Sequence, residues 1–181
     1  MRKKILSLVL SLICLGINAK TVIHAGYLFN TDNGSVEPEM SIIIENERFS
    51  EVLEGYISPS PDDNYIDLTG YYVLPGLIDM HVHLTNQSSN RAYLERITLN
   101  AADYAIRATK NAEKTLMAGF TTVRNLGDSD SITISLRNAI NNGIVIGPRI
   151  FSSGKTISST GGHGDSTNSL NQRLTSELGP K

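Results

Sequence analysis

The chain has 181 residues, of which 40% are hydrophobic and 19% are charged, with 15 glycines, 6 prolines and a single cysteine. This composition is that of a globular protein long enough for one sizeable core, and it excludes a collagen, a coiled coil or a wholly disordered chain. The formal net charge is −2, so there is no excess of basic residues for binding nucleic acid.

Residues 1–19 have the pattern of a secretory signal peptide. The basic MRKK is followed by the apolar run ILSLVLSLICLGI, which is too short to span a membrane comfortably, and Ala19 precedes Lys20 as a cleavage site requires. We therefore expect a secreted or periplasmic protein without a stable membrane span. An uncleaved anchor and lipoprotein processing at Cys14 are the alternatives, and the short run and the large residue before Cys14 disfavour them.

Cleavage of this segment would change the charge and the thiol content of the chain. It removes three basic residues and no acidic residue, which lowers the formal net charge from −2 to −5. It also removes Cys14, so the mature chain would contain neither a disulfide nor a catalytic thiol. No basic stripe remains, and a nucleic-acid partner is not expected.

Residues 20–72 have the signals of strands and turns. The strand TVIHAGYLF precedes the turn cluster NTDNG, two strands flank Asn46 in MSIIIENERFSEVLEG, and YIDLTGYYV follows the loop SPSPDDN. These patterns predict a small antiparallel sheet, one half of a β-sandwich domain. A sheet of about fifty residues is too small to be stable by itself.

Residues 73–181 change to alternating strands and helices. Strands are predicted at 77–84, 120–126 and 147–154, with one long helix over 93–118 that ends at Gly119 and a second helix from Ile132 to the sequence NNG. This order predicts a parallel sheet with right-handed crossovers. Because no G-x-G-x-x-G follows the first strand, we favour the N-terminal part of a TIM (β/α)8 barrel, with about three strands present, over a doubly wound sheet.

The sequence PGLIDMHVHL in the first of these strands alternates apolar and polar residues. Ile78, Met80, Val82 and Leu84 are predicted to face the helices, and Leu77, Asp79, His81 and His83 the barrel interior. Residues two apart on a strand are about 6.6 Å apart and share a face. Two imidazoles placed in this way can bind one metal ion at the strand's C-terminal end, where barrel enzymes keep their chemistry.

An isolated H-x-H is more often incidental than metal-binding, so its setting decides the interpretation. In a barrel interior, two imidazoles and a carboxylate would be buried together, and each would need a polar partner. A metal ion supplies that partner to both rings. We therefore predict that His81 and His83 are metal ligands.

Three blocks of sequence resemble the amidohydrolase superfamily over residues 21–168. YYVLPGLIDMHVHL resembles its first barrel strand, and NAEKTLMAGFTTVRNLGD and GPRIFSSGKTISSTGGHGD are similar to the secreted Xaa-Pro dipeptidase and imidazolonepropionase-like branch. The resemblance implies hydrolysis of an amide or peptide bond in a small-molecule or dipeptide substrate. One or two divalent metals, expected to be zinc, would polarise the carbonyl and lower the pKa of a bound water.

The resemblance assigns roles to few residues of this chain. His163, in TGGHGD, matches a loop residue that helps to position the substrate or its oxyanion; the alternative is a loop histidine bonded to a neighbouring carboxylate. Asp165 is expected to be that partner or an anchor of the glycine turn. Asp79 is expected to orient its surroundings by hydrogen bonding rather than to shuttle protons. Arg124 and Asp128 are expected to form a structural ion pair.

The chain is short for the barrel that it resembles. From Val73 onwards there are 109 residues, against about 250 in a typical barrel. The family's two further histidines, its bridging lysine and its catalytic aspartate have no match, and Lys155 follows the third strand rather than the fourth. We therefore expect an N-terminal fragment that is inactive alone. The alternatives are a non-catalytic remnant or interaction module, and a cyclic-amide hydrolase or deacetylase; the sequence does not indicate the oligomeric state.

Overall fold

The computed structural model describes residues 19–165, 167 and 168. The predicted signal peptide lies outside this part of the chain, except for Ala19. No helix within the described residues is long and apolar enough to cross a membrane. The chain divides into two compact units between Pro75 and Gly76.

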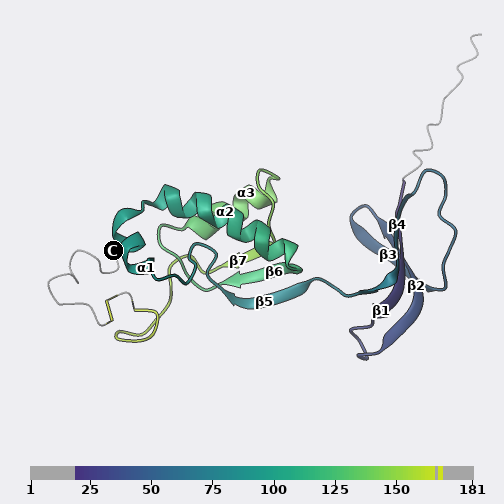
Figure 1. Cartoon of the computed structure of the whole chain (residues 1–181), viewed down its shortest axis with the longest axis horizontal. Coiled ribbons are helices and arrows are strands. Elements are labelled where there is room, and N and C mark those ends of the chain that lie inside the picture. Colours follow the sequence, from purple (N-terminus) through teal and green to yellow (C-terminus); the bar gives the residue numbers. More distant parts are fainter. Residues whose placement is uncertain (1–18, 166, 169–181) are drawn as a thin grey trace, which may run out of the picture. The chain divides into compact units, whose positions relative to one another are not determined.

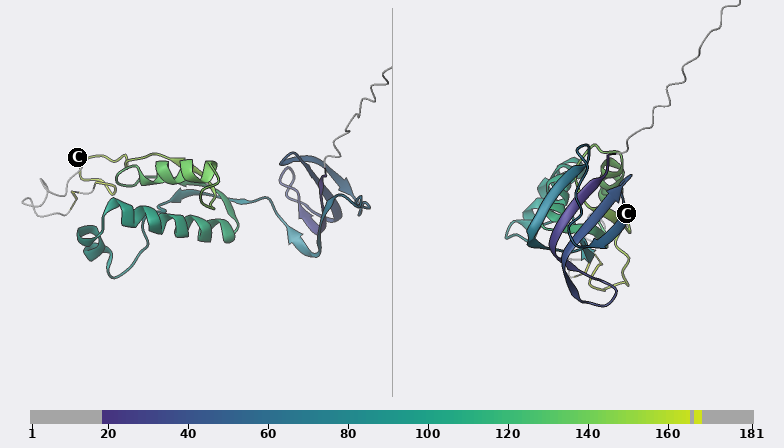
Figure 2. Two further views of the ribbon diagram at one scale, coloured as in Figure 1. Left: turned by 90° about the horizontal axis from the view of Figure 1, so that it is seen from above. Right: turned by 90° about the vertical axis from the view of Figure 1, so that its right-hand side faces the viewer.

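The first unit is a single four-stranded sheet (Figure 2). Its strands are β1 (Thr21–Phe29), β2 (Val36–Glu45), β3 (Arg48–Glu54) and β4 (Asn64–Val73), in the order β3-β2-β1-β4. β2 is antiparallel to both β1 and β3, but β4 is parallel to β1. The prediction of an antiparallel sheet was therefore wrong for β4. A crossover over residues 55–63, rather than a hairpin, returns the chain to the start of β1.

The crossover is held to the sheet by buried polar groups. Ser41 on β2 is fully buried; its hydroxyl donates to the Gly55 carbonyl at 2.7 Å and accepts from the Ile57 N–H at 3.0 Å. The ring of His24 on β1 lies 2.8 Å from the Ile57 carbonyl through Nε2. Each of these buried groups thus has a partner, as burial requires.

The second unit contains a three-stranded parallel sheet and three helices. Its strands are β5 (Leu77–Val82), β6 (Phe120–Asn125) and β7 (Arg149–Ser152), in the order β5-β6-β7, and its helices are α1 (Ala92–Thr98), α2 (Ala101–Met117) and α3 (Ile132–Asn141). Figure 1 shows α2 and α3 on the same face of this sheet. The prediction of a parallel α/β fold, matching the first part of a barrel, is confirmed.

The core of the second unit lies between this sheet and its two covering helices. Its buried members are Leu84, Ala108, Ala112, Val123, Ile132, Leu136 and Ile150. Ala108 and Ala112 on α2 are fully buried. Their small side chains let the helix lie close to the strands. The core thus covers one face of the sheet.

The predicted long helix over 93–118 is interrupted, so this prediction was wrong at Leu99 and Asn100. Leu99 is extended, with φ −100° and ψ 142°. Asn100 is the N-cap of α2, and its N–H donates to the Asp103 carboxylate at 2.9 Å. This bond satisfies a donor that has no partner inside the helix. The predicted end of the helix is confirmed, since Gly119 has φ +95° and its N–H donates to the Leu116 carbonyl.

Candidate functional site

The loops that follow β5, β6 and β7 meet at one edge of the parallel sheet (Figure 1). Main-chain bonds continue past the strand ends, since the Leu126 N–H donates to the Val82 carbonyl at 3.2 Å and the Ser153 N–H to the Asn125 carbonyl at 3.1 Å. In parallel α/β sheets this carboxyl-terminal edge is where ligands bind. It also carries the two candidate metal ligands.

The rings of His81 and His83 lie side by side, with centroids 5.4 Å apart and ring planes at 67°. Val82 and Leu84, which alternate with them, pack against the core beneath the helices. The two imidazoles therefore project from the other face of the sheet, as predicted. The expected burial was wrong, because both histidines are exposed and no described residue covers this face.

Asp79 does not share the face of the histidines, which corrects the predicted alternation. Asp79 is opposite Val123 and Val82 is opposite Asn125, with a shift of register between these two pairs. Because Val123 and Asn125 are both fully buried, the extra residue on β5 turns Asp79 towards the helices. There it lines a hollow of about 350 Å³ beside α2.

Two further residues of β5 depart from the predicted pattern. Ile78 and Met80 were expected to face the helices, but they are 60% and 52% exposed. The same shift of register explains their exposure. Residues before the shift point to the face of the sheet opposite to the one expected from simple alternation. The Asp79 carboxylate accepts the main-chain N–H of His81 at 2.9 Å, so its contact is with the strand and not with the imidazole.

His83 has a defined partner for one ring nitrogen. Its Nδ1 lies 3.0 Å from the Gly127 carbonyl in the loop after β6. A carbonyl only accepts, so Nδ1 carries the proton and Nε2 of the neutral ring presents a lone pair. Metal-binding histidines characteristically donate their second ring nitrogen in this way.

The spacing of the two rings fits a shared metal ion. Two imidazoles bound to one zinc at about 2.0–2.1 Å, with a tetrahedral angle between them, have ring centroids about 5 Å apart, close to the 5.4 Å observed. The part of the chain that the structure describes contains no group of three or more His, Cys, Asp or Glu residues that could hold a metal. We call this pair of candidate ligands, His81 and His83, the half-site.

A buried polar network lies beneath this edge, and the sequence reasoning missed it. Asn125 and Thr133 are both fully buried. The Asn125 amide accepts the Leu84 N–H at 2.9 Å and donates to the Thr133 hydroxyl at 3.3 Å, and that hydroxyl lies 2.7 Å from the Ser152 hydroxyl. The network joins the ends of all three strands to α3. Its one signal in the sequence is a polar Asn125 two residues after the core Val123, on the same face of the strand.

Arg124 and Asp128 do not form the predicted ion pair. Arg124 donates through Nε to the Met80 carbonyl at 2.8 Å. The Asp128 carboxylate instead accepts the N–H groups of Ile132 and Thr133, at 2.8 and 3.2 Å. The unpaired donors at the start of α3 attract a carboxylate, which explains why Asp128 turns inwards.

The loop after β7 contains the two remaining candidates, His163 and Asp165. The Asp165 carboxylate accepts the Gly161 N–H at 2.7 Å and both the hydroxyl and the N–H of Thr167, at 2.7 and 2.9 Å. The Thr167 hydroxyl, followed by the two main-chain donors, lowers the pKa of Asp165 below its usual value. Asp165 therefore anchors the glycine turn. His163 is exposed, and no hydrogen bond to its ring occurs among residues 19–165, 167 and 168.

Residues 72–180 match the model of the amidohydrolase family. The chain belongs to the amidohydrolase family. Among solved structures, a Xaa-Pro dipeptidase with methionine bound in its active site is 46% identical, with a TM-score of 0.77 over 86% of this chain and 38% of that one. A prolidase in complex with N-methylphosphonate-L-proline is 34% identical, with a TM-score of 0.70 over 88% of this chain and 38% of that one.

Among proteins compared by sequence, the ochratoxinase of Aspergillus niger is 26% identical over 151 residues, which are 80% of this chain and 30% of that protein. This amidohydrolase chain thus spans between 30% and 38% of the length of these three relatives. The resemblance inferred from the three sequence blocks is confirmed. Family membership indicates a hydrolase, and the superfamily is generally metal-dependent.

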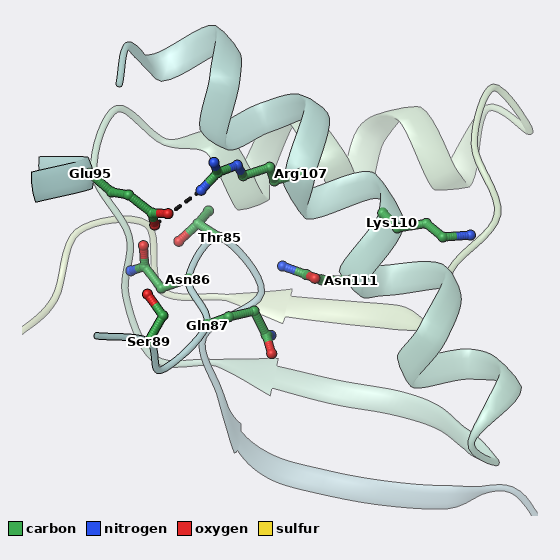
Figure 3. A pocket seen from close by; sticks show the side chains of 8 residues that line it. All are labelled: Thr85, Asn86, Gln87, Ser89, Glu95, Arg107, Lys110 and Asn111. Atoms are coloured by element: carbon green, nitrogen blue, oxygen red, sulfur yellow. Dashed lines mark ion pairs between the residues drawn. The ribbon is translucent and has the colours of Figure 1, made fainter. Parts of the chain in front are cut away.

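A hollow of about 290 Å³, lined by polar and charged residues, lies in this amidohydrolase chain between α2 and the loop that follows the two histidines (Figure 3). Glu95 and Arg107 form an ion pair of 3.1 Å at its rim. The Asn111 amide donates to the Leu84 carbonyl at 2.7 Å and so fastens α2 to the end of the first barrel strand. The hollow is lined by Thr85, Asn86, Gln87, Ser89, Glu95, Arg107, Lys110 and Asn111.

Proposed function

We propose that this chain supplies the first two metal ligands, His81 and His83, of an exported amidohydrolase that cleaves the C–N bond of a dipeptide or an N-acyl amino acid. The observation that carries the proposal is the pair of rings 5.4 Å apart at the carboxyl-terminal edge of the sheet. The bond from His83 Nδ1 to the Gly127 carbonyl leaves Nε2 free to bind the ion.

The bound cation would supply Lewis-acid polarisation of the scissile carbonyl and acidify a water near neutral pH. Zinc is the proposed ion, because imidazole ligands suit it well. A catalytic zinc normally has three protein ligands, so at least one more would have to come from outside the described residues. His163 would position the substrate from the loop after β7, in a turn that the Asp165 carboxylate holds in place.

The comparisons favour a dipeptide over a cyclic amide. The 46% and 34% identities to a Xaa-Pro dipeptidase and a prolidase extend over 86% and 88% of this chain. The 36% and 38% identities to two dihydroorotases, which are cyclic-amide hydrolases, extend over only 35% of it. A substrate with a C-terminal proline is therefore the first to test. The alternative is a non-catalytic module.

The test uses the protein expressed from its complete reading frame. We expect zinc-dependent hydrolysis of Xaa-Pro dipeptides, with both bound zinc and activity falling at least tenfold in His81→Ala and in His83→Ala. Met80→Ala is the matched control, since Met80 is an exposed residue of the same strand. Unchanged zinc content in both histidine variants would refute the metal site. Zinc binding without hydrolysis of dipeptides, N-acyl amino acids or cyclic amides would favour the non-catalytic module.

Export is a separate part of the proposal. The mature protein, recovered from the periplasm or medium, should begin at Lys20, because Ala19 ends the predicted signal peptide. N-terminal sequencing measures this directly. A protein that keeps Met1 and stays in the cytoplasm would contradict it.

A further inference from the structure

The peptide group between Gly127 and Asp128 is bonded at both of its polar atoms. Its carbonyl, on Gly127, accepts the ring of His83 at 3.0 Å. Its N–H, on Asp128, donates to the Gly154 carbonyl at 2.9 Å. Because a peptide group is planar, the direction of the carbonyl that meets His83 is tied to the direction of the N–H that meets the loop after β7.

The Asp128 side chain holds the same peptide group from its other end. Asp128 is 9% exposed, and its carboxylate accepts the N–H groups of Ile132 and Thr133 at the start of α3, as well as the Thr133 hydroxyl. Two main-chain donors and the positive end of the helix dipole hold a carboxylate firmly at this position. The main chain at Asp128 therefore has little freedom to move, and the 127–128 peptide group is held in place with it.

Gly127 is constrained by the loop after β7. Its φ is +149°, and an added Cβ would lie 2.7 Å from the Cα of Thr156. Thr156 therefore packs directly against the main chain of Gly127, which only a glycine allows at this position. The residues on both sides of the 127–128 peptide are thus held: Gly127 packs against the loop after β7, and Asp128 is hydrogen-bonded to the start of α3.

We propose that Asp128 is the positioning residue of the half-site: it holds the 127–128 peptide so that the Gly127 carbonyl keeps His83 protonated at Nδ1, with Nε2 directed to the metal. Asp128 touches neither the metal nor the substrate and acts only through this peptide. The metal-binding consequence rests on the proposed function. The effect on the imidazole does not, because the hydrogen bond exists without a metal.

The ring of His81, unlike that of His83, makes no hydrogen bond to any described residue. Its one ring contact among these residues is with His83. The positioning by Asp128 is therefore specific to one of the two candidate ligands. His81 and His24 serve as internal references within the same molecule.

The first measurement is the tautomer of His83 in the metal-free full chain, read from the ring ¹⁵N shifts by NMR. We expect the Nδ1–H form to dominate in the unchanged chain and the Nε2–H form to become the major one in Asp128→Ala, with His81 and His24 unaltered. Asp103→Ala is the matched control, because Asp103 caps α2 through the Asn100 N–H and has no bond to this network. An unchanged His83 in Asp128→Ala, or an equal change in Asp103→Ala, would overturn the proposal.

A conservative substitution separates positioning from general stability. Asp128→Asn keeps an oxygen for the helix donors, since Asn caps helices about as well as Asp, and it should restore the Nδ1–H form of His83. If Asp128→Ala does not fold, Thr133→Val takes its place. It removes the hydroxyl that contacts the Asp128 carboxylate and should shift His83 in the same direction to a smaller extent. No shift in folded Thr133→Val would also overturn the proposal.

A zinc titration of the same variants tests whether Asp128 affects metal binding. We expect Asp128→Ala to weaken zinc binding at His83 by about tenfold or more, the usual effect of losing a group that orients a ligand. Loss of the Nδ1–H tautomer without any loss of zinc affinity would refute the metal part. If His81→Ala and His83→Ala leave zinc binding unchanged, the proposed function fails, while the tautomer result still decides the role of Asp128.

Discussion

The ring of His83 and the carbonyl of Gly127 join the ends of β5 and β6 through a 3.0 Å hydrogen bond between residues 44 apart in the chain. This bond connects a candidate metal ligand directly to the main chain of the loop after β6. Any change that moves the Gly127 peptide should therefore be detectable at His83.

Gly127→Ala should destabilise the second unit and release His83. The new Cβ would conflict with the Thr156 Oγ1 and lie 2.7 Å from its Cα, at a φ of +149°. Strain of this kind costs about 1–3 kcal/mol, and the contact adds to it. Gly143→Ala is the control, because Gly143 also has a positive φ, +68°, but has open space around it. Urea unfolding should show a larger loss for Gly127→Ala; equal losses would contradict the steric argument.

Asn125→Leu should remove the link between the strand ends. The Leu84 N–H would lose its acceptor at a fully buried position, and an unsatisfied buried donor costs about 1–3 kcal/mol. Chemical denaturation measures the change in unfolding free energy. Asn138→Leu, at an exposed position on α3, should change it by less than about 0.5 kcal/mol. A loss in Asn125→Leu as small as that of the control would show that the network does not support the sheet.

Thr167→Val should raise the pKa of Asp165 towards 3.8. The Thr167 hydroxyl is the first cause of the lowered pKa, and Val cannot donate. A carboxyl with a lowered folded pKa stabilises the turn fully above its unfolded pKa, and this contribution is lost as the pH falls through the folded value. The turn should therefore open at a higher pH in the variant, within the range below about pH 4.

A ¹³C NMR titration of the carboxyl groups tests this change. Asp67 is the internal control, because its pKa is lowered chiefly by the Thr69 N–H and should not respond to Thr167→Val. An Asp165 that titrates as before would rule out the hydroxyl as the cause.

Tyr65→Phe should weaken the first unit. The Tyr65 hydroxyl lies 3.0 Å from His24 Nδ1, and Nε2 of that ring faces the Ile57 carbonyl, so the hydroxyl is the donor to Nδ1. Its removal leaves a buried acceptor unsatisfied, at a cost of about 1–2 kcal/mol. Tyr71→Phe, at a position that is 65% exposed, should be neutral in thermal unfolding. Equal melting temperatures for the two variants would contradict the role of the hydroxyl.

Local patterns predicted most of the elements. The strand at Thr21–Phe29 has the bounds expected from its sequence, and the helix at Ile132–Asn141 begins and ends at the signals beside it. These predictions succeeded because alternation, caps and turn residues act over a few neighbouring residues. The shared face of His81 and His83 followed from the same short-range geometry.

Long-range contacts account for the errors. β4 is parallel to β1 because a crossover places it on the other side of β1 from β2. Asp79 faces the helices because β5 shifts register against β6. Asp128 caps α3 rather than pairing with Arg124 because the helix start supplies buried donors beside it. None of these three causes is visible within a short stretch of sequence.

The sequence by itself determined the order of the elements, the amidohydrolase resemblance and the pairing of two imidazoles on one face, since each depends on residues that are near neighbours. Only the tertiary structure decided which of the two imidazoles, His81 or His83, is hydrogen-bonded through its second ring nitrogen, and to which group. Gly127 meets His83 because β5 and β6 lie side by side as parallel strands. The register of this pairing, including its shift, is set by packing between residues far apart in the chain.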